Sequence, residues 1–468
     1  MGRIPTRRLG AFVSPALPLA AIGLPFSVHL PPYYAGELGL SLGTVGFLFF
    51  IVRAIDLPLD PVLGHWIDRT RTRWGRFRPW FVAGAATLVA ASYLVFMAPQ
   101  GLSAIHAFWS IMLLYLGLSM FQLSHQSWAA TLSEDYDQRS RVFGWLQATG
   151  VFGMVLVLLL PPIAAKVTGD AGRAAGVHAM GWFVIAVLPL AVLLTLGSTR
   201  EAPRRKDMVE PRLLDMLALL KNRLMARLLV ADLLAGIAPG ISGAMFLFYF
   251  EHRLGFDAAT ASLLLLLYFV AGLAAAPLWM KLAYRIGKHR AASFAGLYFV
   301  LTNSMLLLLP THSLAAAAFG MAVAGVPFAA FPFLMRAMLA DVIDTDRLTY
   351  GADRTGLFSA VLTTTSKIAH ALPIGVIYPL LGWMDFHPEP GAVNAPEAIA
   401  GMTALFIGAP GLVMAGAAWT TWRWPHDAQA HAAVQAALAQ HGEAGDGAKI
   451  APSEQLGEAA AAVATPAE

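Results

Sequence analysis

Residues 177–198 read VHAMGWFVIAVLPLAVLLTLGS, and residues 199–212 continue as TREAPRRKDMVEPR. The first stretch contains no Asp, Glu, Lys or Arg. It is long enough to cross the hydrocarbon core of a bilayer as an α-helix, which takes about 20 mostly apolar residues. The second stretch carries five basic and three acidic residues. A membrane-spanning segment is thus followed by a charged loop, and this alternation recurs along the whole chain.

The composition of the chain is that of a membrane protein. Of its 468 residues, 57% belong to the hydrophobic set AVILMFWYC and 13% are charged, whereas soluble domains carry about 25% charged residues. A soluble protein this apolar would lack the polar surface to cover itself. The composition therefore excludes disordered, coiled-coil, collagen-like and ordinary cytosolic proteins. Cysteine is absent, which excludes a disulfide framework and a thiolate metal site.

Apolar runs of this length predict twelve transmembrane helices in two groups of six. The first six lie near 10–33, 41–66, 79–98, 103–131, 142–165 and 177–198. The second six lie near 226–251, 259–283, 291–310, 313–338, 355–382 and 398–424. The runs lack the polar–apolar alternation of a transmembrane β-strand. A weak repeat, PVLGHWIDR from Pro61 and PLWMKLAYR from Pro277, favours two six-helix halves in the same orientation, as in many secondary transporters.

This count divides the chain into four parts. They are an N-terminal half at 1–198, a cytoplasmic central loop at 199–225, a C-terminal half at 226–424 and a cytoplasmic tail at 425–468. Residues 210–223 gather apolar side chains on one face, which predicts a helix that lies on the inner leaflet. The tail is rich in Ala, Gln and Glu, and we expect a short helix up to about Gln440 followed by disorder.

The basic residues predict the orientation of the helices. With both termini in the cytoplasm, 27 of the 32 Lys and Arg residues fall in cytoplasmic segments. Three fall on the opposite side, namely Lys166, Arg173 and Arg253, and two fall inside spans. This is a strong positive-inside pattern. It also removes nucleic acid as a partner, because the basic residues face lipid headgroups.

The second span contains Arg53, Asp56 and Asp60 at spacings of three and four, which place all three on one helical face. Ionisable side chains in a span are costly and usually face a cavity or one another. Two carboxylates one turn apart repel unless a cation or a proton lies between them. Oxygen ligands also suit a hard cation such as Na⁺. The pattern predicts a cation or proton site with Arg53 as charge partner; the alternative is an intrahelical ion pair that fixes packing.

Residues on three further spans are candidates for substrate contacts. The fourth span ends with Gln122, His125, Gln126 and Trp128. Such hydrogen-bonding groups beside an aromatic face are typical of sugar sites, although bundles also use them between helices. Lys367, in the middle of the eleventh span, must pair with a carboxylate, substrate or water. Asp232 lies early in the seventh span, where it either faces a cavity or lies near the cytoplasmic surface.

No enzyme signature is present in the sequence: H-E-x-x-H, G-x-S-x-G, the phosphate-binding G-x-x-x-x-G-K-[ST] loop and a dinucleotide glycine run are all missing. The loop from Asp68 to Pro79 carries five arginines. It serves as an orientation signal, and we expect its ion pairs also to hold helices together at the cytoplasmic side.

These residues resemble a known family. The run Arg53-x-x-Asp56-x-x-x-Asp60-Pro61-x-x-Gly64-x-x-x-Asp68-Arg69-Thr-Arg71-Thr-Arg73-Trp-Gly75-Arg76-x-Arg78-Pro79-Trp80 is similar to the melibiose permease-like glycoside–pentoside–hexuronide:cation symporters of the major facilitator superfamily. The stretches Leu132–Arg141 and Met338–Lys367 resemble the same family. The resemblance implies the major facilitator fold and a cation-coupled symporter of a sugar or glycoside, without cofactor and not an enzyme. It further implies a monomer in the bilayer of a bacterial inner membrane.

The resemblance also implies roles for individual residues. The coupling cation, H⁺ or Na⁺, is expected at Asp56 and Asp60, with Gln122 beside them. Substrate contacts are expected from Arg53, His125, Gln126, Trp128, Gln147, Asp232 and Lys367. The cytoplasmic gate is expected from Asp68, Arg69, Arg76, Arg139, Asp341, Asp344 and Arg354.

The chain departs from the melibiose permease-like pattern at three positions. Ala20 stands where those proteins have a sugar-contacting aspartate, Gln122 replaces an aspartate of helix 4, and Gln147 aligns with a sugar-binding arginine. The cation half-site is thus retained and the galactoside half-site is not. A lysolipid or drug carrier of the same fold therefore stays open as an alternative, and a non-transporting membrane receptor or enzyme is a second one.

The departure at Gln122 bears on the coupling ion. Loss of an acid lowers the negative charge that holds a metal cation, whereas one carboxylate is enough to hold a proton. His125 lies close by, and histidine titrates near physiological pH. The sequence therefore predicts H⁺ rather than Na⁺ as the coupling ion.

Overall fold

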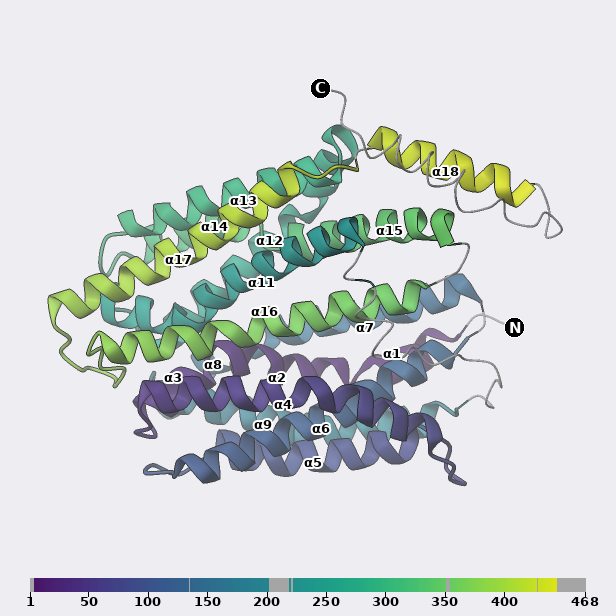
Figure 1. Cartoon of the computed structure of the whole chain (residues 1–468). Coiled ribbons are helices and arrows are strands. Elements are labelled where there is room, and N and C mark those ends of the chain that lie inside the picture. Colours follow the sequence, from purple (N-terminus) through teal and green to yellow (C-terminus); the bar gives the residue numbers. More distant parts are fainter. Residues whose placement is uncertain are drawn as a thin grey trace.

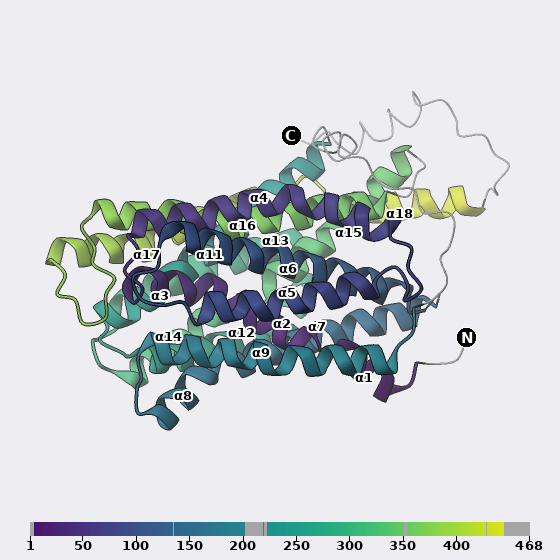
Figure 2. The ribbon, with the colours of Figure 1, turned by 90° about the horizontal axis from the view of Figure 1, so that it is seen from below.

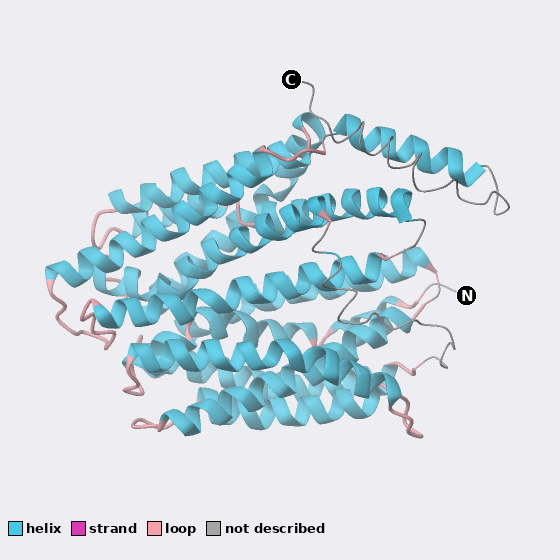
Figure 3. Ribbon diagram, in the orientation of Figure 1, coloured by secondary structure: helices cyan, strands magenta, loops and turns pink. Residues whose placement is uncertain are grey.

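The computed structural model describes residues 4–133, 135–201, 219, 222–350, 354–426 and 428–443. Within these residues the protein is a bundle of helices joined by loops, and Figure 3 shows no strand among them. Twelve of the helical segments are long and apolar enough to cross a membrane, which confirms the predicted count. The predicted interfacial helix at 210–223 lies almost entirely outside the described residues.

The N-terminal half contains six of the twelve spans, and Figure 1 labels its helices. Its helices are α1 (Thr6–Val13), α2 (Ala16–Val28), α3 (Leu30–Gly36), α4 (Leu42–Arg69), α5 (Arg78–Phe96), α6 (Ala104–Thr131), α7 (Tyr136–Leu158), α8 (Leu160–Thr168) and α9 (Arg173–Ser198). Each predicted run in this half matches a helix or a broken helix in the structure.

The C-terminal half contains the other six spans. Its helices are α11 (Arg223–Phe248), η1 (Tyr249–Arg253), α12 (Ala258–Ile286), α13 (Lys288–Met305), η2 (Leu306–Leu308), α14 (Leu314–Gly325), α15 (Ala330–Tyr350), α16 (Thr355–Trp383) and α17 (Pro396–Trp422). Helix α18 (Ala428–Glu443) follows in the tail. The segment predicted to be disordered beyond it lies outside the described residues.

Proline accounts for several breaks inside spans. Pro15 lies between α1 and α2, Pro161 stands at the start of α8, and Pro327 lies between α14 and α15. A proline ring lacks the backbone N–H and clashes with the carbonyl of the preceding turn, so the helix stops or bends there. Apolar content alone does not reveal such breaks, which is why one predicted run can correspond to two or three helices.

Glycine allows the closest helix contacts. A Cβ on Gly84 of α5 would lie 2.7 Å from the backbone N of Phe121 on α6. A Cβ on Gly46 of α4 would lie 2.7 Å from Pro379 on α16. Small residues let membrane helices approach closely, and dispersion contacts then hold them together. The second contact joins the two halves, because α4 and α16 pack along one another (Figure 2).

Candidate cation and substrate site

Asp56 and Asp60 lie on a stretch of α4 that contains Pro58 and Pro61. Because proline has no N–H, the carbonyls four residues earlier, at Ala54 and Leu57, lack their usual helical partner. In a membrane such free backbone groups are tolerated where they line a protein interior or a cavity. The local sequence therefore places both carboxylates on a helix segment suited to a cavity wall.

The two carboxylates meet basic side chains from both halves. Arg53 Nη1 lies 3.2 Å from Asp56 Oδ2, and Ser119 Oγ on α6 donates to Asp56 Oδ1 at 2.8 Å. Lys367 Nζ on α16 forms an ion pair with Asp60 and lies 3.9 Å from Asp56 Oδ2. This cluster, formed by Arg53, Asp56, Asp60 and Lys367, joins the two halves in the middle of the bundle.

The charges of the cluster balance. Two carboxylates face one guanidinium and one ammonium, so the sum is zero with all four groups ionised. The Asp56 side chain is 1% exposed, and the Asp60 and Lys367 side chains are 19% and 25% exposed. Oδ1 of Asp60 is buried and has no hydrogen-bond partner among the described residues. Asp60 therefore has one carboxylate oxygen free to bind a further cation or a proton.

A cavity of about 240 Å³ lies against this cluster. Arg53, Asp56, Gln122 and Lys367 line it, together with the Tyr115 ring, whose centroid lies 5.0 Å from the Arg53 guanidinium carbon. Below we refer to this cavity as the charged chamber. The sequence analysis missed Tyr115 and Ser119, although their spacing from Gln122 puts all three on one face of α6.

A larger cavity of about 520 Å³ lies beside it, lined mainly by the C-terminal half. We refer to it as the apolar chamber, because apolar side chains such as Phe246, Phe269 and Phe328 form most of its wall. Gly23, Ser27, His370 and Ile374 line both chambers, which are therefore adjacent.

Asp232 lines the apolar chamber, as the cavity alternative for this residue predicts. Its Oδ2 accepts a hydrogen bond from Ser366 Oγ at 2.8 Å, and the Ser366 carbonyl lies 2.7 Å from His370 Nδ1. Arg336 lines the same chamber. Helix α16 thus carries Lys367 toward the carboxylates of α4 and the neighbouring Ser366 toward Asp232.

Four predicted substrate residues lie away from both chambers. His125 and Trp128 are buried among the rings of Phe12 and Phe81, and His125 Nε2 lies 2.9 Å from the Phe12 carbonyl. Gln126 and Gln147 are exposed and line neither chamber. The end of α6 extends beyond the cavity, and α1 and α5 cover it there.

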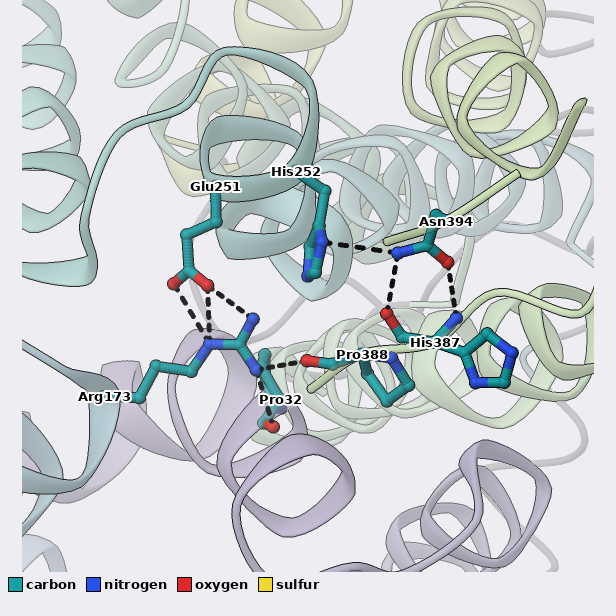
Figure 4. A network of polar contacts seen from close by, with 7 residues as sticks. All are labelled: Pro32, Arg173, Glu251, His252, His387, Pro388 and Asn394. Atoms are coloured by element: carbon teal, nitrogen blue, oxygen red, sulfur yellow. Dashed lines mark hydrogen bonds and ion pairs between the residues drawn. The ribbon is translucent and has the colours of Figure 1, made fainter. Parts of the chain in front are cut away.

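The bundle is closed at the end away from the described termini by a polar network that joins the halves (Figure 4). Arg173, at the start of α9, forms an ion pair with Glu251 of η1 at 2.5 Å, and its side chain is 1% exposed. Its Nη1 also donates to the carbonyls of Pro32 at 3.2 Å and Pro388 at 2.8 Å. We refer to Arg173, Glu251 and these two carbonyls as the latch.

At the opposite end, the ion pairs among described residues stay within one half. Asp68 pairs with Arg76 at 3.3 Å in the N-terminal half. In the C-terminal half, Lys288 pairs with Asp341 at 2.6 Å, and Arg354 pairs with Asp346.

The other gate candidates lie at the same end. His431 of α18 lies 3.3 Å from Asp341 and 3.8 Å from Asp344. Arg69 is exposed, and the side chain of Arg139 is outside the described part of the structure.

Glu201 is a residue at this end that the sequence analysis did not select. Its carboxylate accepts three hydrogen bonds from backbone N–H groups of Arg76, Phe77 and Arg78, at 2.6, 2.7 and 2.6 Å. These N–H groups stand at the start of α5, where a helix leaves its donors unsatisfied and favours negative charge. Glu201 therefore anchors the basic loop to the segment that follows α9.

Comparisons with known proteins agree with this architecture. The glucuronide carrier protein homolog of Escherichia coli K12 is 25% identical over 384 residues, covering 80% of this chain and 83% of that protein. The lactose permease of Lactobacillus delbrueckii subsp. bulgaricus is 26% identical over 336 residues, covering 68% of this chain and 52% of the permease. The match thus spans about half the length of that permease.

Structural and family comparisons point the same way. The crystal structure of the nucleoside transporter NupG superimposes with a TM-score of 0.66 at 15% identity, covering 90% of this chain and 100% of that one, which shows the fold. The family model described as MFS/sugar transport protein matches residues 11–428. The chain therefore belongs to the MFS/sugar transport protein family, and it is an integral, multi-pass membrane transporter of small molecules rather than an enzyme.

Proposed function

We propose that the protein is a cation-coupled symporter of a sugar or glycoside that works by alternating access. We place it as a monomer in a bacterial inner membrane with both termini in the cytoplasm. One observation carries this proposal: Lys367, which lines the charged chamber, forms an ion pair with Asp60 that joins the two halves. The names of the glucuronide carrier homolog and the lactose permease support a sugar as substrate.

Coupling follows from competition for Asp60. Lys367 and an incoming cation both seek the same carboxylate, so a cation that binds Asp60 releases the ammonium. The released Lys367 remains at the charged chamber, where it can donate hydrogen bonds to substrate hydroxyls. Substrate and cation therefore favour the same rearrangement of the cluster, which is the differential binding that symport requires.

The charge balance of the cluster favours H⁺ as the coupling ion. Arg53 and Lys367 already neutralise Asp56 and Asp60, so a metal cation would enter a site without net negative charge. An acid at position 122 would supply negative charge, but Gln122 lines the chamber as a neutral amide. A proton needs a single oxygen, and Oδ1 of Asp60 is buried without a hydrogen-bond partner among the described residues.

The latch supports a cycle between two conformations. It joins the halves at the end away from the described termini, whereas the ion pairs at the other end stay within one half. We infer that the structure corresponds to the conformation open toward the cytoplasm. Opening the other side requires Arg173 to leave Glu251 and the Pro388 carbonyl.

The test is uptake by purified protein in proteoliposomes with an imposed proton gradient, using a panel of radiolabelled glycosides. We expect Asp60→Asn to abolish gradient-driven accumulation while the protein still inserts and folds. Asp385→Asn is the matched control, because that carboxylate is 94% exposed and is not part of the cluster. Wild-type accumulation by Asp60→Asn would remove Asp60 from the coupling site.

A further inference from the structure

The apolar chamber differs in chemistry from the charged chamber. Six phenylalanines and four methionines line it, and Asp232 and Arg336 are its charged residues apart from His370. Phe269 and Phe328 form an edge-to-face pair with centroids 4.7 Å apart, and Tyr268 meets Phe328 at 5.7 Å. Such rings present a large apolar surface with defined geometry. Methionine adds a polarisable side chain that adapts to different shapes.

Several polar groups on this lining already donate hydrogen bonds within the protein. Thr302 Oγ1 donates to the Tyr298 carbonyl at 2.9 Å, and Asn303 Nδ2 donates to the Ile407 carbonyl at 2.9 Å. Ser366 donates to Asp232. Apart from the Arg336 guanidinium and the Tyr268 hydroxyl, which also line the chamber, few donors are thus left for a ligand. A free sugar ring in this chamber would leave hydroxyl groups without partners, and each such buried group costs binding free energy.

The charged chamber carries more hydrogen-bonding side chains on its wall, beside apolar ones such as Phe26, Phe49 and Leu118. Arg53, Gln122 and Lys367 are hydrogen-bonding side chains that line it. His370 lines both chambers, next to the contact between Ser366 and Asp232. The junction is therefore polar, and one side of it is suited to a sugar while the other is suited to an apolar group.

From this arrangement, and resting on the proposed function, we propose that the substrate is a glycoside with an apolar aglycone. The sugar ring occupies the charged chamber beside Lys367, and the aglycone occupies the apolar chamber against Phe269 and Phe328. The glycosidic bond lies at the junction near His370. An aryl group of one or two rings suits the aromatic wall, because rings favour edge-to-face and offset contacts.

The experiment compares methyl and phenyl glycosides that share one sugar. Radiolabelled β-D-glucosides, galactosides, xylosides and glucuronides of each kind are tested for uptake into proteoliposomes containing the full chain. For every sugar that is transported, we expect the phenyl glycoside to have a KM at least roughly tenfold lower than the methyl glycoside, since even one methylene in an apolar pocket changes selectivity by about tenfold or more.

A chamber-filling variant tests the location. Met321→Trp places a larger side chain into the apolar chamber from α14 and should reduce the phenyl advantage to about twofold or less. Met280→Trp is the matched control, because Met280 is 44% exposed and lines neither chamber, so the ratio should keep its wild-type value. If Met321→Trp does not insert, Met414→Phe makes the same test from α17.

The outcomes separate this inference from the proposed function. Equal KM values for methyl and phenyl glycosides, or a phenyl advantage that Met321→Trp leaves intact, would overturn the inference while the symporter stands. Accumulation of none of the glycosides under any gradient would overturn the proposed function and the inference together. Uptake of lysophosphatidylcholine in place of the glycosides would do the same, and it would establish the lipid-carrier alternative.

Discussion

Charge balance between Lys367 and Asp60 gives the sharpest prediction. Lys367→Gln leaves two carboxylates against one guanidinium, and Asp60→Asn leaves two cations against one carboxylate. The double variant Lys367→Gln/Asp60→Asn restores a neutral cluster with Arg53 and Asp56. We therefore expect each single variant to destabilise the protein and the double variant to be more stable than the sum of the two losses predicts.

The size of this effect follows from the geometry. Lys367 Nζ contacts Asp60 Oδ2 directly, and two unit charges even about 4 Å apart attract by about 4 kcal/mol at an effective dielectric constant near 20. The Lys367 and Asp60 side chains are 25% and 19% exposed, so solvent screens part of the attraction. We expect a coupling energy of about 2 kcal/mol between Lys367 and Asp60, within the range for residues of one ion-pair network.

The assay is a double-mutant cycle on the purified protein in dodecyl maltoside, with unfolding followed by SDS titration. Uptake is measured on the same four proteins. The double variant should recover stability but not gradient-driven uptake, because it lacks the Asp60 carboxylate that binds the coupling ion. Strictly additive losses of stability would refute a direct interaction of Lys367 with Asp60. Recovery of coupled uptake in the double variant would refute the role of Asp60 in coupling.

Three further predictions concern other parts of the fold. A Cβ at Gly36 would lie 2.5 Å from both Arg173 Nη1 and the Pro388 carbonyl oxygen, so Gly36→Ala should open the latch. The assay labels a single Ser27→Cys, introduced into this cysteine-free chain, with an impermeant maleimide from outside, and the labelling rate should rise several-fold in Gly36→Ala. The control Gly43→Ala should leave the rate unchanged, and an unchanged rate in Gly36→Ala as well would argue against the latch. Glu201→Gln should lower the unfolding free energy by roughly 2 kcal/mol, because an amide has a single acceptor oxygen and no charge, so at least one of the three N–H groups loses its acceptor; SDS titration measures this, and wild-type stability would exclude an anchoring role. Asp56→Asn should abolish proton-driven accumulation, because it removes the charge that Arg53 and Ser119 hold in place; accumulation at the wild-type level would show that Asp60 alone suffices.

Much of the fold could be predicted from the sequence because bilayer thickness imposes a length on each apolar run. The twelve spans follow from that constraint, and ends such as those of α4 and α6 were predicted to within a few residues. The breaks could not be predicted in the same way. Pro15 and Pro327 interrupt runs that remain apolar throughout, so the helix stops while the hydropathy does not change.

From residue spacing alone, the site was predictable only where a single helix carries it. Asp56 and Asp60 share a face of α4, and that face follows from their spacing. The identity of the partner of Asp60 does not follow from spacing, because Lys367 is 307 residues away and meets Asp60 only through the packing of α4 against α16. His125 looked like a cavity residue from its neighbours in the chain, yet Phe12 and Phe81 cover it. Long-range packing, which spacing does not encode, decides both cases.

Proton binding at the cluster of Arg53, Asp56, Asp60 and Lys367 is proposed to drive substrate accumulation. Uptake of the radiolabelled glycoside panel into proteoliposomes should be measured with H⁺ and Na⁺ gradients imposed separately and the membrane potential clamped. We expect accumulation with an inward proton gradient and none with a Na⁺ gradient at fixed pH. Strong stimulation by Na⁺ at fixed pH, with no response to a proton gradient, would contradict it.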